Sequence, residues 1–222
     1  MLKYTRSEEN YLKAIYGISQ RSDKGANTNA IAARLETKAS SVTDMIKKLS
    51  DKGLVDHKKY KGAELTNSGQ EVAVSVIRKH RLWETFLVKH LRFKWDEVHE
   101  IAEQLEHVHS EELIDRLDAF MDYPKFDPHG DPIPDKEGVI EGRSESTVLK
   151  EISVNNIARI VGVRNSSNEF LRFLDGIGLR LGTQITVVRK FEFDNSMEVS
   201  THFKSGITLS DQVCKDLVVQ PL

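Results

Sequence analysis

The sequence contains one cysteine, Cys214, among its 222 residues. A single cysteine excludes an intramolecular disulfide and any metal site built from cysteine alone. No apolar run approaches the roughly 18–20 residues that span a bilayer, and the first residues lack the pattern of a signal peptide. We therefore expect a cytoplasmic protein with no membrane partner.

Proline is also scarce, and its distribution divides the chain. Four of the five prolines lie between residues 124 and 134, so no helix is expected to cross that stretch. Before it, the apolar spacing predicts helical regions over 69–92 and 96–122. After it, a linker over 135–147 leads to a compact β-barrel of about 75 residues. The predicted elements of this barrel are strands at 158–163, 183–188 and 197–203 and one short helix at 167–174.

The net charge of −2 conceals an uneven distribution. Residues 1–62 carry 13 Lys and Arg against 7 Asp and Glu, a balance of +6. Residues 96–122 carry 10 acidic residues, one Arg and three His, a balance of −9. The basic segment indicates a polyanion partner and the acidic segment a cation partner. Solvated helix faces give similar counts, so neither balance decides the matter alone.

The first 66 residues have the element order of a winged helix. A helix is predicted after Ser7 as its N-cap, a second over 28–35, and a third from Ser40 to Asp51, followed by two short strands around a turn at Gly62. This order suits duplex DNA, with the third helix in the major groove and the hairpin wing on phosphates. A winged helix that mediates only protein contacts is the alternative. The predicted DNA contacts are Thr28, Lys38, Ser40, Ser41, Thr43, Lys47 and three wing lysines, Lys58, Lys59 and Lys61.

Metal-binding side chains are concentrated in the acidic segment. At about 100° per residue, one helical stripe would hold His99, Glu103, Glu106 and His107, and the preceding helix offers His80 and Glu84 at i and i+4. Imidazole and carboxylate donors without thiolate favour Mn²⁺, Fe²⁺ or Zn²⁺. A solvated acidic helix face is the alternative. His109 falls on the apolar side of the same wheel and is left out of the set.

Several ordered motifs resemble a known family. They are Glu9-Asn-Tyr-Leu-Lys-Ala-Ile-Tyr16, Ser41-Val-Thr43, Arg78-Lys-His-Arg-Leu82, Glu103-Gln-Leu-Glu-His107 and Pro128-His-Gly-Asp-Pro-Ile-Pro134. Over residues 5–140 the chain resembles the iron- and manganese-dependent repressors related to the diphtheria toxin repressor and the manganese transport regulator. The tail is similar, more weakly, to the SH3-like (FeoA-like) domain of that family.

The resemblance implies a mainly α fold with a β tail. It implies a winged helix-turn-helix DNA-binding domain over 1–72, a helical dimerisation and metal-binding domain over 73–140, and an SH3-like domain over 141–222. The implied function is a homodimeric repressor that senses Mn²⁺ or Fe²⁺, binds a DNA operator and controls metal-uptake genes. Catalysis is not expected, since no hydrolase motif such as His-Glu-x-x-His is present. A metal-independent winged-helix protein remains the alternative.

The resemblance also implies two metal sites. His80, Glu84 and His99 match one site of iron-type members, and the core of the other is matched by Glu103, Glu106 and His107. In manganese-type members His80 joins that second core around a pair of ions. Glu169 matches a ligand position in the tail domain.

Three positions depart from the family pattern. Asn10 stands where relatives have methionine or aspartate, and Lys13 replaces a manganese-type carboxylate and cannot bind a metal. Glu103 stands at the cysteine position of iron-type members, which favours Mn²⁺ over Fe²⁺. The same donors also suit Zn²⁺, Co²⁺, Ni²⁺ and Cd²⁺ in vitro.

Overall fold

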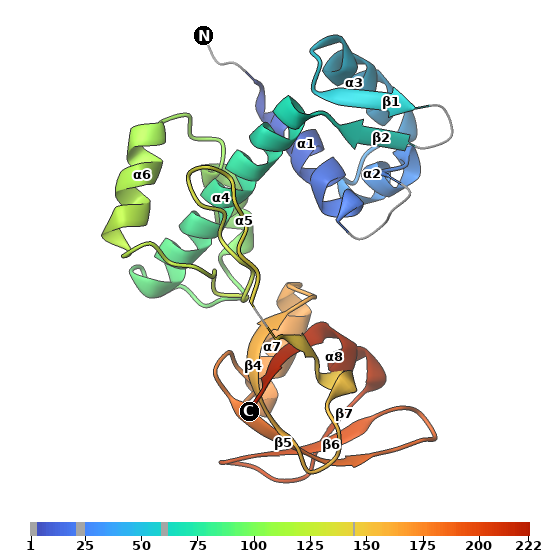
Figure 1. Cartoon of the computed structure of the whole chain (residues 1–222), viewed down its shortest axis with the longest axis vertical. Helices are drawn as coiled ribbons and strands as arrows, with labels where there is room; N and C mark the ends of the chain where they lie inside the picture. Colours follow the sequence, from blue (N-terminus) through green and yellow to red (C-terminus); the bar gives the residue numbers. More distant parts are fainter. Residues whose placement is uncertain (1–3, 21–24, 59–61, 144) are drawn as a thin grey trace. The chain divides into compact units, whose positions relative to one another are not determined.

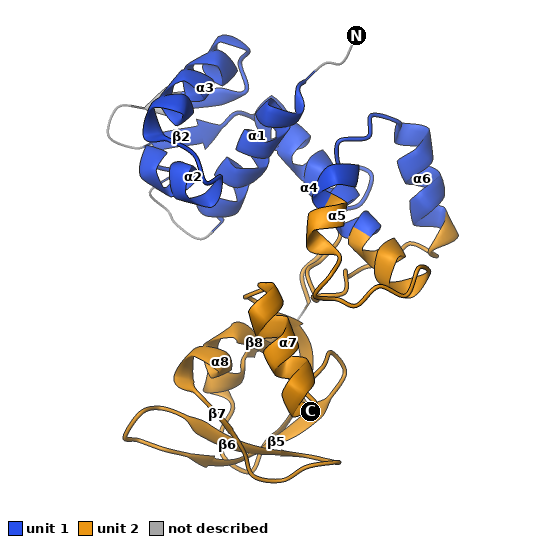
Figure 2. Ribbon diagram, turned by 180° about the vertical axis from the view of Figure 1, so that it is seen from behind, with its two compact units in different colours: residues 1–83, 103–119, 134–139 blue, residues 84–102, 120–133, 140–222 orange. Residues whose placement is uncertain are grey.

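The computed structural model describes residues 4–20, 25–58, 62–143 and 145–222, without the side chains of residues 57 and 58. These residues fall into two compact units, shown in Figure 2. Unit 1 comprises residues 1–83, 103–119 and 134–139, and unit 2 comprises residues 84–102, 120–133 and 140–222.

Unit 1 begins with a winged helix (Figure 1). Its elements are α1 (Arg6–Ser19), α2 (Thr28–Arg34), α3 (Ala39–Asp51), β1 (Val55–Lys58) and β2 (Gly62–Leu65). The two strands pair antiparallel, and Ala26 forms a further bridge with Ala63. One apolar face of each helix supplies the core, whose fully buried members include Leu12, Ile15, Ile31, Val42 and Leu49. The predicted helix-turn-helix and wing are confirmed.

Helix α1 starts two residues earlier than predicted. Thr5, not Ser7, is the N-cap: its side chain accepts from the backbone N–H of Glu8, whose carboxylate accepts from the Thr5 N–H at 2.9 Å. This capping box satisfies two backbone donors at once, which a cap at Ser7 with Asn10 three residues on could not match. Buried Glu8 also pairs with Lys48 and Lys52.

The middle of the chain forms three helices rather than the two expected regions. They are α4 (Asn67–Lys89), α5 (His99–Leu105) and α6 (Glu111–Phe120). The prediction of one helical region over 96–122 is wrong in its centre, because Ser110 caps a new helix: its hydroxyl accepts from the Leu113 N–H at 3.3 Å. Glu111 and Glu112 then fill the first turn, where carboxylates are favoured. Residues 106–110 are therefore not helical.

Most of unit 2 is a six-stranded antiparallel sheet of order β3-β8-β4-β5-β6-β7. The predicted strands correspond to β4 (Ile157–Val163), β5 (Gln184–Lys190) and β6 (Met197–Thr201), and the predicted helix to α7 (Asn168–Ile177). Its core includes buried Leu171, Leu174, Val187 and Val199. The elements missed from the sequence are β3 (Thr147–Val148), η1 (Leu149–Glu151), β7 (Ile207–Leu209), α8 (Asp211–Asp216) and β8 (Leu217–Pro221).

A tight turn over residues 127–131 packs against β4 in unit 2. The Asp127 Oδ1 atom accepts from the backbone N–H groups of His129 and Asp131, at 2.8 and 3.0 Å. Gly130 has φ +91°, and a Cβ there would lie 2.2 Å from the Val161 carbonyl oxygen. Only glycine permits both that conformation and that approach.

The expected fold class is confirmed: a helical, winged helix-turn-helix head precedes a β tail. The domain limits proposed from the sequence stay a prediction. Within the described ranges, every helix is too short or too polar to cross a membrane.

Candidate metal centre

In unit 1, six side chains from α1, α4, α5 and the turn after α5 form what we call the Glu106 cluster. Glu106 and His107 directly follow the last residue of α5, so the helical stripe predicted for them is wrong in geometry, although the residues still converge. The members are Glu9, Lys13, His80, Glu103, Glu106 and His107.

Glu106 is the centre of this cluster and is 1% exposed. Its Oε2 atom lies 2.5 Å from His80 Nδ1 and accepts from Lys13 Nζ at 2.6 Å. Burial alone would raise the pKa of Glu106, but the His80 hydrogen bond and the Lys13 charge outweigh it and leave that pKa below its usual value. Glu106 therefore carries a negative charge inside the fold.

The other oxygen of Glu106 faces His107. The His107 Nε2 atom lies 3.7 Å from Glu106 Oε1 and is buried, with no hydrogen-bond partner among the described residues. On the other side of the ring, Nδ1 lies 2.5 Å from Glu9 Oε2. A carboxylate can only accept, so Nδ1 donates to Glu9, and in the neutral form of the ring Nε2 presents a lone pair. A buried lone pair beside a buried carboxylate is the donor arrangement that a metal ion requires.

Two further predicted ligands of unit 1 are less buried than Glu106. Glu103 is half-exposed, and its Oε1 atom lies 3.7 Å from Lys13 Nζ. Asn10 is half-buried on α1, directly after Glu9. Sequence reasoning missed Glu9, because the family pattern pointed to its neighbour. His109 was set aside as apolar-facing, yet its Nδ1 atom lies 3.8 Å from Glu9 Oε1.

Unit 2 holds a second group of metal-binding side chains around Glu84 of α4, which is 2% exposed. The Glu84 carboxylate lies 3.2 Å from His99 Nδ1 and 3.4 Å from His129 Nδ1. Donor atoms of Glu84, Asp127 and His129 all lie within 4.8 Å of one another, and all three residues are buried. Asp127 and His129 were not among the predicted ligands, although the Pro128–Pro134 motif contains His129.

His129 also connects this group to the β domain. Its Nε2 atom donates to the Trp95 carbonyl oxygen at 2.8 Å, and Trp95 Nε1 donates to Asp175 of α7 at 3.1 Å. Burial would lower the pKa of His129, but the hydrogen bond and charge of Glu84 raise it to about 9. Glu169, the ligand expected from the tail, is exposed on α7.

The predicted DNA-contacting residues of α3 lie on its exposed face, opposite its buried apolar residues. The exposed set is Ser40, Ser41, Thr43 and Lys47. Lys38 is the exposed N-cap residue of α3 and makes no side-chain capping bond, and Thr28 is the first residue of α2. Lys59 and Lys61 lie outside the described residues, as does the side chain of Lys58.

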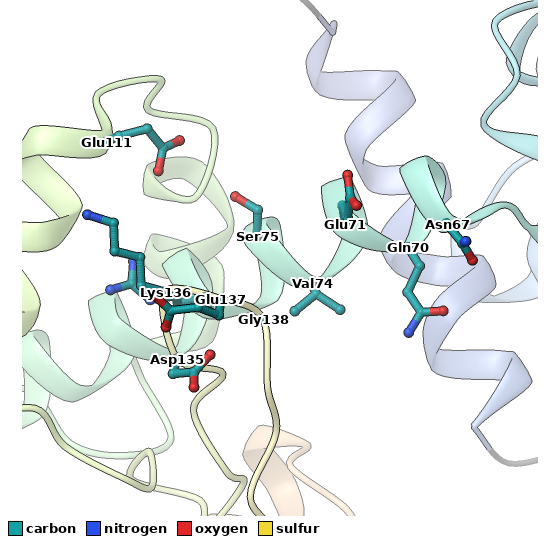
Figure 3. Close-up of a pocket in the computed structure, with 11 residues that line it drawn as sticks. Asn67, Gln70, Glu71, Val74, Ser75, Glu111, Asp135, Lys136, Glu137 and Gly138 are labelled. Atoms are coloured by element: carbon teal, nitrogen blue, oxygen red, sulfur yellow. The ribbon is translucent and has the colours of Figure 1, made fainter.

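A polar groove of about 440 Å³ also lies in unit 1 (Figure 3). Its lining comes from the first half of α4, the start of α6 and residues 135–138, and mixes Glu71, Glu111 and Glu137 with Arg78 and Lys136. None of the predicted metal ligands or DNA contacts is among its lining residues.

Three family models match the chain. The N-terminal DNA-binding domain of iron-dependent repressors matches residues 3–63, their metal-binding and dimerisation domain matches 66–135, and the FeoA domain matches 147–221. The solved structure of a manganese-dependent transcriptional repressor in complex with manganese is 34% identical, has a TM-score of 0.85, and aligns over 97% of this chain and 100% of its own. The chain belongs to the iron-dependent repressor family.

Two relatives show how far the similarity to this family extends. The iron-dependent repressor IdeR of Mycobacterium leprae is 36% identical over 126 residues, which cover 57% of this chain and 54% of that protein. The chain thus matches about half the length of the mycobacterial relative. The diphtheria toxin repressor of Corynebacterium efficiens is 26% identical over 221 residues, which cover 96% of this chain and 94% of its own. The family resemblance seen in the sequence motifs is confirmed.

Proposed function

We propose that this chain is a cytoplasmic, homodimeric, metal-dependent repressor that binds an operator when Mn²⁺, or alternatively Fe²⁺, is plentiful, and so controls metal-uptake genes. The observation that carries the proposal is the buried Nε2 atom of His107, which has no hydrogen-bond partner among the described residues and lies 3.7 Å from a buried carboxylate oxygen. Leaving such an atom without a partner is costly unless a ligand satisfies it. Family membership of the metal-binding and DNA-binding segments supports the same conclusion.

His107 and Glu106 would hold the principal ion, with Glu103 and Asn10 as further oxygen donors. When bound, the ion supplies positive charge between α1 and the end of α5. Glu9 fixes the His107 ring by accepting its Nδ1 proton, the usual role of a carboxylate behind a metal-binding imidazole. Three oxygen donors and one nitrogen without sulfur favour Mn²⁺ over Fe²⁺.

A second ion would be held by Glu84 and His99, which are in contact, with His80 one turn before Glu84 on α4. Glu169 would contribute from α7. These assignments rest on the family positions, and the short Glu84–His99 separation supports them.

Metal and DNA binding are coupled in this proposal because α1 belongs to both sites. Its residues Leu12 and Ile15 pack in the core of the winged helix, while Glu9 and Lys13 face the Glu106 cluster. Fixing α1 at the cluster would therefore favour one placement of the two heads of a dimer, which must meet major grooves about 34 Å apart. By reciprocity, operator DNA would tighten metal binding by the same factor.

The experiment is a Mn²⁺ titration of DNA binding by the parent protein and by His107→Ala and Glu106→Gln, with Glu192→Gln as a control on an exposed turn. The probe is a duplex selected from a random library in the presence of Mn²⁺. Both cluster variants should lose the response to Mn²⁺ while the control keeps it. A variant that responds with an unchanged midpoint would remove its residue from the site, and a parent protein indifferent to metal would favour the metal-independent alternative.

A further inference from the structure

We propose that the Lys13 ammonium group is a tethered cation that takes the place of a second metal ion among His80, Glu103 and Glu106. The Glu106 cluster would then hold one exchangeable ion rather than a pair. This inference rests on the proposed function and adds to it the number of ions that the cluster accepts.

The position of the ammonium group carries the argument. Lys13 Nζ lies 2.6 Å from Glu106 Oε2, 3.2 Å from His80 Nδ1 and 3.7 Å from Glu103 Oε1. Each of these groups is a donor that metal ions use in proteins, and all three face one point. An ordinary ion pair between α1 and α5 would need only one of them.

The two oxygens of Glu106 divide the cluster into two halves. Oε2 faces Lys13 and His80, whereas Oε1 faces His107 Nε2, which has no other partner in the described part of the chain. A carboxylate with a cation on each oxygen is the arrangement that bridges two metal ions. Here one of the two positions already holds a covalently attached charge, and the other remains for a metal.

The Lys13 side chain is 16% exposed, so the charge is enclosed by the protein. An ammonium group is a compact point charge with rotatable donors, which suits the carboxylates of Glu106 and Glu103, while His80 Nδ1 donates to the same Glu106 oxygen from its other side. Unlike a metal ion, it cannot leave when the external concentration falls. A tethered cation therefore neutralises the cluster permanently on one side and repels a second divalent ion at short range.

The test compares the parent protein with Lys13→Glu and Lys13→Gln, and uses Lys204→Glu as a control for the charge change on an exposed loop. Bound Mn²⁺ is counted by native mass spectrometry, and electron paramagnetic resonance distinguishes isolated Mn²⁺ ions from an exchange-coupled pair. We expect Lys13→Glu to bind one more ion per chain than the parent and to show the coupled spectrum. Lys204→Glu should match the parent in both measurements.

An exchange-coupled pair in the parent protein would overturn the inference, and so would a folded Lys13→Glu variant that binds no additional ion. If Lys13→Glu does not fold, the parent spectrum and Lys13→Gln still decide, because Lys13→Gln removes the charge and should also admit the extra ion. These outcomes differ from a failure of the proposed function. In that case the parent protein would bind DNA equally with and without metal, whatever its ion count.

Discussion

Replacing Glu9 with glutamine tests how the protein prepares His107 for a metal ion. The Glu9 carboxylate is 2% exposed and lies 2.5 Å from His107 Nδ1, which must donate to it. Glutamine keeps an acceptor oxygen but removes the charge, and its amide can rotate to present a donor instead. The substitution therefore holds the imidazole ring less firmly and lowers its basicity. It changes none of the side chains that would bind the metal directly.

The magnitude follows from that single bond. A hydrogen bond to a charged group contributes about 1.5–3 kcal/mol, and losing a carboxylate behind a metal-binding histidine costs roughly 10–100-fold in affinity. The two estimates agree, since tenfold corresponds to about 1.4 kcal/mol. Isothermal titration with Mn²⁺ should show this loss for Glu9→Gln and none for Glu192→Gln. An affinity for Glu9→Gln within about twofold of the parent would show that Glu9 does not orient His107.

Three further predictions concern the wing, the first helix and the turn beside β4. Changing the three wing lysines to alanine should weaken binding to all duplexes alike and flatten its salt dependence, measured by fluorescence anisotropy across salt concentrations; an unaltered slope would place the wing off the DNA. Burial would raise the pKa of Glu8, but the hydrogen bonds and charges of Lys52 and Lys48 lower it to about 2. The ionised Glu8 carboxylate therefore stabilises the fold above about pH 4.5, and this contribution is lost as the pH falls towards 2. Glu8→Gln should therefore lower the free energy of unfolding by on the order of 1–2 kcal/mol at pH 7, a figure that allows for solvent screening at the exposed lysines. At pH 2 the substitution should change that free energy little, and urea unfolding at the two pH values measures the difference. Gly130→Ala should lower the free energy of unfolding by about 1–3 kcal/mol or more through backbone strain, and with it the urea midpoint, whereas Gly176→Ala, in open space on α7, should not. Equal midpoints for the two variants would contradict the close approach to β4.

The winged helix and the longer strands of the β domain could be predicted from periodicity alone. In α3, Val42, Ile46 and Leu49 recur on one face and are all buried, as the helical spacing requires. Strands β4, β5 and β6 are rich in β-branched residues and were found in place. The short β3 and the edge strand β7 were missed, because two or three residues carry no measurable periodicity.

The membership of the site stays a prediction, and its geometry differs from the helical stripe expected from the sequence. Glu106 and His107 converge with His80, but through a turn after α5 rather than along one helix, because α5 ends at Leu105 and Ser110 caps a separate helix. Glu9 shows the limit most clearly. Residues 9 and 10 are adjacent, and only the orientation of α1 in the fold places the first of them against His107.

Asp127 and His129 could not be found by helical spacing, since they lie in a turn fixed by hydrogen bonds within residues 127–131. Their approach to Glu84 depends on long-range packing against β4. The available sequence feature was the proline-rich motif itself, which indicated that no helix crosses this stretch but not which residues lie beside it.

The most direct test of the account is the affinity of the parent protein for its selected duplex, measured by fluorescence anisotropy in chelator and again in saturating Mn²⁺. Coupling between two sites is typically about 5–150-fold, and we predict a gain in that range, reversed when chelator is added back. Equal affinities in the two conditions, with Mn²⁺ binding verified separately, would contradict the central claim that occupation of the Glu106 cluster controls DNA binding.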